Sequence, residues 1–150
     1  MLSYIVSDPD RTAFGSDALG RLAEALTSQF DLPALQVELS LATSEEIRDL
    51  NLSYRQLDEP TDVLSFPLFA SLEEILSLPA GIPVLLGSVI VCPEKAAAYG
   101  ESLIQLAEHG ALHLLGFDHV ADPNGWRKAE RPLLAALAAQ GIEIPEVPEA

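Results

Sequence analysis

The pattern of apolar and polar positions predicts about four strands in this chain of 150 residues. Residues 35–41, LQVELSL, alternate strictly, as expected for a strand with one buried face. Residues 84–91 are almost continuously apolar, which indicates a central strand buried on both faces. Shorter strands are predicted at 1–6, closed by the turn-prone residues 7–10, and at 63–66.

Apolar residues spaced three and four apart predict helices between these strands. Ser16 or Asp17 caps the first helix, and Thr43 with Glu46 forms a capping box for the second. The predicted helices span residues 17–30, 44–54, 94–99, 101–115 and 124–140, with one helical turn at 72–76. That turn lies in an excursion over 68–82, which is expected at the surface.

The chain shows no repeat and no linker that would divide it, so one domain is expected over residues 1–150. Within it, the Pro- and Glu-rich segment 142–150 is predicted to be a loose tail. The longest apolar run, 82–92, is too short to cross a bilayer, and the N-terminus lacks the features of a signal peptide. The single cysteine, Cys92, suits a reducing compartment, so we expect a cytoplasmic protein without membrane association.

Charge is the strongest feature of the composition. The chain has 8 basic and 23 acidic residues, for a net charge of -15. This balance argues against broad, nonspecific binding to nucleic acid, which needs a basic surface. It leaves room for a small local basic patch beside a bound metal.

All three histidines of the chain lie in the segment 106–119, LAEHGALHLLGFDH. His109 and His113 are four residues apart, which places both rings on one face of the predicted helix. Gly116 is placed to end that helix, so His119 can turn back toward the first two rings. Three neutral imidazoles with an open fourth position are typical of a catalytic zinc site. We therefore predict one metal ion per chain, with zinc as first choice over nickel, copper or iron.

The same spacing resembles the metzincin pattern His-Glu-x-x-His-x-x-Gly-x-x-His. The histidines and the glycine are in register, but Gly110 stands where those proteases have their glutamate base. Glu108 is a poor substitute, because it points about 100° around the helix from His109. The pattern predicts the metal cage of a protease without its general base.

Two other polar residues are candidates for the same site. Arg55 could hold a phosphate through two hydrogen bonds, or could be a solvated loop residue. Asp118 could orient a ligand imidazole from behind, or could cap the turn in which it lies. The sequence pattern leaves both alternatives open for each residue.

Residues 109–119, His-Gly-x-Leu-His-Leu-x-Gly-Phe-Asp-His, resemble the signature of the YbeY family of bacterial rRNA maturation factors. Two more segments are similar to that family: 51–66, Asn-x-x-Tyr-Arg-x-x-Asp-x-Pro-Thr-Asp-Val-Leu-Ser-Phe, and Leu86-Gly87. Together the three segments cover the chain from about residue 35 to 130. Three segments in the right order make chance similarity improbable.

The chain departs from the family pattern at three places. Ser88 stands where an aspartate is usual, Gln56-Leu57 where Gly-Lys is common, and Phe117 where tyrosine is more usual. These changes leave the predicted metal site intact. They remove one local positive charge and alter a surface near Ser88 at which the resemblance implies ribosome docking.

The resemblance implies an α+β fold, in which helices pack around a small mixed sheet and the metal site lies at the end of a central helix. It implies a zinc-dependent, single-strand-specific endoribonuclease that acts in 16S rRNA 3′-end maturation and ribosome quality control. The zinc ligands would be His109, His113 and His119, and Arg55 would be the catalytic arginine. Expected partners are ribosomal RNA and the small ribosomal subunit or its proteins, with no DNA.

Two other functions remain open from the sequence. One is a metallopeptidase or another metal hydrolase of small substrates, and the other is a non-catalytic ribosome assembly factor with a structural metal. The net charge adds a prediction of its own: free RNA is a poor substrate, and a partner has to present it. On net charge alone, added salt should first help, because it screens the repulsion.

Overall fold

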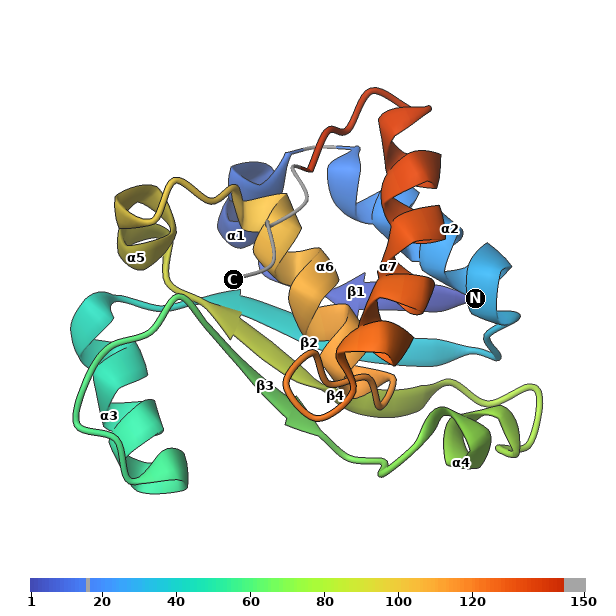
Figure 1. Cartoon of the computed structure of the whole chain (residues 1–150), viewed down its shortest axis with the longest axis horizontal. Helices are drawn as coiled ribbons and strands as arrows, with labels where there is room; N and C mark the ends of the chain where they lie inside the picture. The colour runs from blue at the N-terminus through green and yellow to red at the C-terminus, as the bar shows by residue number, and fades with distance from the viewer. Residues whose placement is uncertain (16, 145–150) are drawn as a thin grey trace.

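The computed structural model describes residues 1–15 and 17–144, and a four-stranded mixed sheet lies at its centre (Figure 1). The strands are β1 (Leu2–Ile5), β2 (Leu35–Leu41), β3 (Val63–Pro67) and β4 (Val84–Val91). Their order is β1-β2-β4-β3; β1, β2 and β4 are parallel, and β3 is antiparallel to β4. The predicted α+β fold with a mixed sheet of four strands is confirmed.

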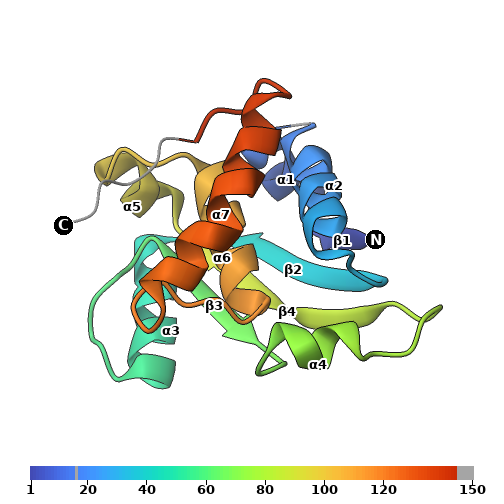
Figure 2. The same cartoon turned by 45° about the vertical axis from the view of Figure 1, so that its right-hand side comes forward.

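Helices cover the two faces of this sheet unequally. They are α1 (Asp8–Phe14), α2 (Ala18–Phe30), α3 (Ser44–Arg55), α4 (Leu72–Leu76), α5 (Pro93–Ala98), α6 (Leu103–Leu114) and α7 (Pro123–Ala138). Helices α1, α2, α6 and α7 gather on one side of the sheet, whereas α3 packs on the other side beside β3 (Figures 1 and 2). The fold therefore has one closed face and one partly open face.

Strand β4 shows this difference along its length. Val89 and Val91 point to the closed face and are almost completely buried. Ile90 points to the other face, where it is half-buried with Leu64 and α3. The prediction that β4 is central is confirmed, but full burial on both faces is wrong, because α3 covers only part of the second face. On the same face Glu38 of β2 is exposed.

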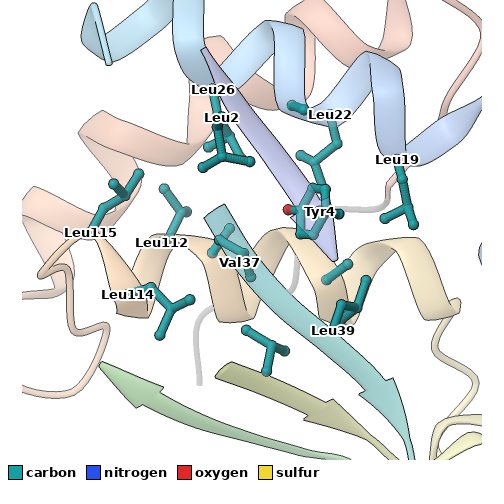
Figure 3. Close-up of a cluster of buried hydrophobic side chains, with 14 of the residues drawn as sticks. Leu2, Tyr4, Leu19, Leu22, Leu26, Val37, Leu39, Leu112, Leu114 and Leu115 are labelled. Atoms are coloured by element: carbon teal, nitrogen blue, oxygen red, sulfur yellow. The ribbon is translucent and has the colours of Figure 1, made fainter. Parts of the chain in front are cut away.

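The main core lies between the closed face of the sheet and α2 and α6. Leucines of α2 and α6 meet inward-pointing residues of β1 and β2 (Figure 3). Four apolar residues of α2 that are spaced three and four apart in the sequence, Leu19, Leu22, Ala23 and Leu26, are all buried. The apolar periodicity of this segment therefore identified the correct face.

Residues 7–10 do not form the predicted turn, since α1 begins there. The side chain of Ser7 accepts a hydrogen bond from the backbone of Asp10, and Pro9 lies in the first turn of the helix. A helix tolerates proline at this position, because the first N–H groups have no partner within the helix. Serine, aspartate and proline favour turns and helix starts alike, which is why the prediction was wrong. Ser16, proposed as a helix cap, lies outside the described residues.

The excursion over 68–82 lies mostly exposed at the surface, as predicted, and Ile75 of α4, which is completely buried, anchors it to the core. Ile142 and Ile144 pack against the core as well, which corrects the prediction of a loose tail for residues 142–144. The remainder of that predicted tail, 145–150, lies outside the described residues.

Candidate metal centre

Helix α6 carries the first two histidines, His109 and His113, and packs closely on the sheet. Ser102 and Gln105 form a capping box at its N-terminus. Gly110 faces β4, and a Cβ atom there would lie 2.6 Å from Cγ1 of Val89. A side chain at position 110 would therefore push α6 away from β4. Glycine allows the close packing that sets the height of His109 and His113.

The turn after α6 brings the third histidine back. Gly116 has a φ of 99°, a left-handed conformation that suits glycine. Its N–H donates to His113 O, and the N–H of Phe117 donates to Leu112 O, which is the pair of hydrogen bonds of a Schellman motif. The turn also packs on α4, since a Cβ at Gly116 would lie 3.1 Å from Cα of Ser71. The helix thus ends as the sequence predicted, and the chain returns to His119.

The three imidazoles converge as predicted. Nε2 of His109 and Nε2 of His113 are 3.2 Å apart. One ring nitrogen from each of His109, His113 and His119 lies within 4.8 Å of the other two. Tetrahedral zinc, with Zn–N distances of about 2.0–2.1 Å, needs its nitrogens roughly 3.3 Å apart. The first pair already has this spacing, and His119 completes the donor set from the exposed side of the cluster.

Electrostatics keep the inner two rings neutral. Burial, followed by the neighbouring His113 and His119, lowers the pKa of His109 to about 4. Burial and His119 lower the pKa of His113 too. A metal binds the neutral form of imidazole, so these rings can coordinate near pH 7 without first losing a proton. The donor set therefore fits the predicted zinc ion.

Trp126 of α7 completes the cluster, although the sequence pattern does not mark it as a site residue. Its ring centroid lies 4.8 Å from that of His109, 5.0 Å from His113 and 5.2 Å from His119. The indole is only 6% exposed, so it shields one side of the three rings from water. The only sequence signal for Trp126 was its position among the apolar residues of the last helix. That position indicates that the indole is buried, but it does not indicate which element the indole contacts.

Asp118 is held mainly by the turn. Its Oδ1 accepts hydrogen bonds from the backbone N–H groups of Val120 and Ala121, which lower its pKa. The same oxygen lies 3.9 Å from Nδ1 of His119, beyond hydrogen-bond distance but close enough for electrostatic attraction. The geometry thus accounts directly for a role in the turn, while orientation of His119 stays a prediction.

Arg55 is the last residue of α3 and is exposed. Among the residues that the structure describes, no carboxylate or histidine forms an ion pair or hydrogen bond with it. The neighbouring Asn51, from the same sequence segment, is buried and donates to the carbonyl of Glu59. Asn51 therefore holds the loop after α3, and Arg55 is left open to solvent and to a ligand.

The structure offers no peptidase base at the two positions that the motif suggests. Gly110 points at β4, and the metzincin glutamate would be directed into the core there. Glu108 is 1% exposed and lies beside Glu130. Burial and the charge of Glu130 raise its pKa well above the usual range, so it is a neutral core group. Neither residue can serve as a base for a water molecule at the histidines.

The α+β fold and the three-histidine cluster at the end of a helix together define a class of protein: small α+β proteins with a candidate catalytic metal centre. The family profile described as Endoribonuclease YbeY matches residues 11–136, most of the chain. This chain belongs to the YbeY family.

Individual relatives agree with this assignment. A protein of Sulfurovum sp. (strain NBC37-1) named Endoribonuclease YbeY is 37% identical over 124 residues, which covers 79% of this chain and 79% of that protein. One of the same name from Paramagnetospirillum magneticum is 41% identical over 139 residues, or 84% of this chain and 81% of the relative. The solution structure of TM1509 from Thermotoga maritima superposes with a TM-score of 0.53 at 26% identity, covering 94% of this chain and 92% of the other.

Within residues 1–15 and 17–144, no helix has both the length and the apolar character that crossing a membrane requires.

Proposed function

We propose that this protein is a zinc-dependent endoribonuclease that cuts single-stranded ribosomal RNA, in 16S 3′-end maturation and ribosome quality control. The observation that carries the proposal is the convergence of His109, His113 and His119 within 4.8 Å, in a chain whose relatives are named endoribonucleases. The proposal includes a cytoplasmic location and the small ribosomal subunit as partner. The single, buried cysteine supports the reducing compartment.

One zinc ion per chain would be held by the three imidazoles. Bound there, zinc supplies Lewis-acid activation of water or of a phosphodiester oxygen. The side chain of His119 is 45% exposed, so the site opens to solvent on that side. Structural zinc sites are usually closed by four protein ligands, and three ligands at an open surface favour catalysis over a purely structural metal.

The chain's own residues prepare the reaction. His109 and His113 stay neutral at pH 7 because their pKa values are lowered, so their nitrogen lone pairs remain available. Trp126 excludes water from one side of the rings, which strengthens electrostatic interactions in the site. Arg55 is proposed to pair with the phosphate and to stabilise the charge that grows on it during cleavage.

A peptidase is disfavoured by the packing of α6. The glutamate that a metzincin needs would have to occupy position 110, where even a Cβ atom lies 2.6 Å from a methyl group of Val89. The fold and the histidine cluster are equally compatible with a non-catalytic ribosome assembly factor, so experiment has to distinguish that function from the nuclease.

The test compares zinc-loaded protein on four substrates: single-stranded RNA, small ribosomal subunits, duplex RNA and casein. We expect slow cleavage of free single-stranded RNA, faster cleavage on the ribosomal subunits, none of duplex RNA or casein, and no cleavage by His113→Ala treated with the same zinc solution. Cleavage of casein would support the peptidase. Stoichiometric zinc without cleavage of any substrate, on free RNA or on small ribosomal subunits, would support the assembly factor and refute the proposal.

A further inference from the structure

Helix α7 carries a basic strip on its outer side, formed by Arg127, Lys128 and Arg131. These are three of the 8 basic residues in the whole chain, and they lie within five consecutive positions. They line an open groove of about 620 Å³, together with Asn124, Gly125 and Pro132. In a protein of net charge -15, this is a local exception that the total charge conceals.

The helical geometry separates this strip from the buried side of α7. At about 100° per residue, Lys128 and Arg131 lie about 160° and 140° around the helix from Trp126 and face away from it. Arg127 lies at the edge, about 100° away. Trp126 and Leu133 are buried on the inner side, whereas Lys128 and Arg131 are exposed. The strip and the histidine cluster therefore lie on opposite sides of one helix, about 10–12 Å across.

The carboxylates beside α7 contact other groups than Lys128 and Arg131. Glu130 is directed toward the buried Glu108, and the carboxylate of Asp122 accepts the backbone N–H of Gly125 at the start of α7. Arg127 donates to Asn124 Oδ1. Within the described residues, Lys128 and Arg131 form no ion pair with an acidic side chain. Their positive charge is available to an anion from solution.

We propose that this strip binds the phosphate backbone of the single-stranded RNA next to the cleavage site. The inference rests on the proposed function for the choice of RNA, while the strip itself is observed independently of the metal site. The first turn of α7 follows directly on the loop that carries His119, so a strand at the histidines can continue around this end into the groove. The strip then holds nucleotides that flank the cleaved bond.

The charge pattern favours RNA over an acidic protein. Lys128 and Arg131, two exposed cations along one groove, match the regular charges of a nucleic acid backbone, and each contact releases a counterion. Asp122 lies at the groove beside Gly125 and offsets part of this charge, whereas repulsion from more distant carboxylates is screened within about 8 Å at physiological ionic strength. Local charge thus dominates on contact, and affinity for RNA should fall as salt rises. This trend is opposite to the one that net charge alone predicts.

The experiment measures binding of a short, fluorescein-labelled single-stranded RNA by anisotropy, in EDTA and across about 50 to 200 mM salt. The test variant is Lys128→Gln with Arg131→Gln. The control is Lys95→Gln with Arg21→Gln, which removes one lysine and one arginine from α5 and α2 and leaves the same net charge. A second control, Lys128→Arg with Arg131→Lys, keeps both charges in the strip. Circular dichroism checks that every variant is folded.

Each phosphate contact contributes a slope of about -0.7 to the dependence of log affinity on log salt for a single strand. Two contacts, from Lys128 and Arg131, predict a slope of about -1.4 for the parent, falling to about zero in the test variant. At 0.1 M salt the test variant should bind about 25-fold more weakly. Both controls should bind as the parent does.

Equal affinity of the test variant and the charge-matched control would overturn the inference, whether or not the parent cleaves RNA. Polyglutamate and unlabelled RNA are compared as competitors at equal concentrations of charge. If polyglutamate competes as strongly as RNA, the assignment to RNA is overturned and an acidic protein is indicated instead. A zinc-loaded parent that binds RNA through the strip but cuts none would refute the proposed nuclease and leave the inference standing.

Discussion

Replacing Gly110 by alanine tests how strongly the packing of α6 on β4 determines the metal site. The new Cβ would lie 2.6 Å and 2.9 Å from the two methyl groups of Val89, and 3.2 Å from Oγ of Ser65. Val89 is 1% exposed in a central strand, and its β-branched side chain has little freedom to rotate. Helix α6 therefore has to move outward.

The magnitude follows from two opposing terms. Overpacking a well-filled core costs about 1–3 kcal/mol. Alanine in place of glycine within a helix returns up to about 1 kcal/mol. Contacts below 3.0 Å to two methyl groups place this site in the upper part of the range, so we expect a net loss of about 1–2 kcal/mol. For a chain of 150 residues this lowers Tm by roughly 2–8 °C.

Gly20 provides a matched control. It also lies in a helix, α2, but nothing lies within 4 Å of a Cβ at this position. Gly20→Ala should therefore stabilise the protein by about 0.5–1 kcal/mol, with the sign opposite to that at Gly110. Val89→Ala provides a rescue: alone it should cost about 2–3 kcal/mol, and combined with Gly110→Ala it should cost less than the sum by about 1–2 kcal/mol.

Urea denaturation followed by circular dichroism measures these free energies, and a competition titration with a zinc chelator measures metal affinity. We expect Gly110→Ala to bind zinc more weakly, because His109 and His113 move with α6. A Gly110→Ala protein as stable as the parent, or additive effects of the 110 and 89 substitutions, would show that the contact with Val89 does not limit the position of α6.

The remaining predictions concern the site and its surroundings. His113→Ala should lose tight zinc binding, since two imidazoles alone hold zinc poorly; stoichiometric zinc in elemental analysis would contradict this. Arg55→Ala should cut RNA cleavage by about 10²–10³ while Tm and zinc content stay nearly unchanged, as for loss of one donor to a developing charge; cleavage at the parental rate would reduce Arg55 to a solvated residue. Glu101→Gln tests the pH dependence of stability. Burial and then Asp62 raise the pKa of Glu101 to about 7. The contribution of protonated Glu101 to the free energy of unfolding is therefore fully present below about pH 4.5 and is lost as pH rises through 7. Thermal scans should show the variant more stable than the parent above pH 7, by at most about 1 kcal/mol after solvent screening, and equal to it near pH 4; a constant difference at all pH values would exclude this titration.

The local features of this protein could be predicted from sequence because their information is local. Strict alternation over 35–41 identified β2, and Thr43 with Glu46 identified the start of α3, where both hydrogen bonds of the capping box are present. The spacing of His109, His113 and Gly116 on one helix and its turn was enough to predict the convergence of the rings. Each of these depends on residues a few positions apart, whose relative directions follow from backbone geometry.

Tertiary packing decided what lies around the histidines. The pattern did not predict that Trp126 covers all three rings, that Glu108 is buried beside Glu130, or that the basic residues of α7 face a groove on its far side. The residues that meet in these contacts belong to different elements. Periodicity assigns each residue to a face of its own helix, but only the packing of α6 and α7 on the sheet determines which faces meet, because that arrangement is the one that buries the apolar side of every element at once.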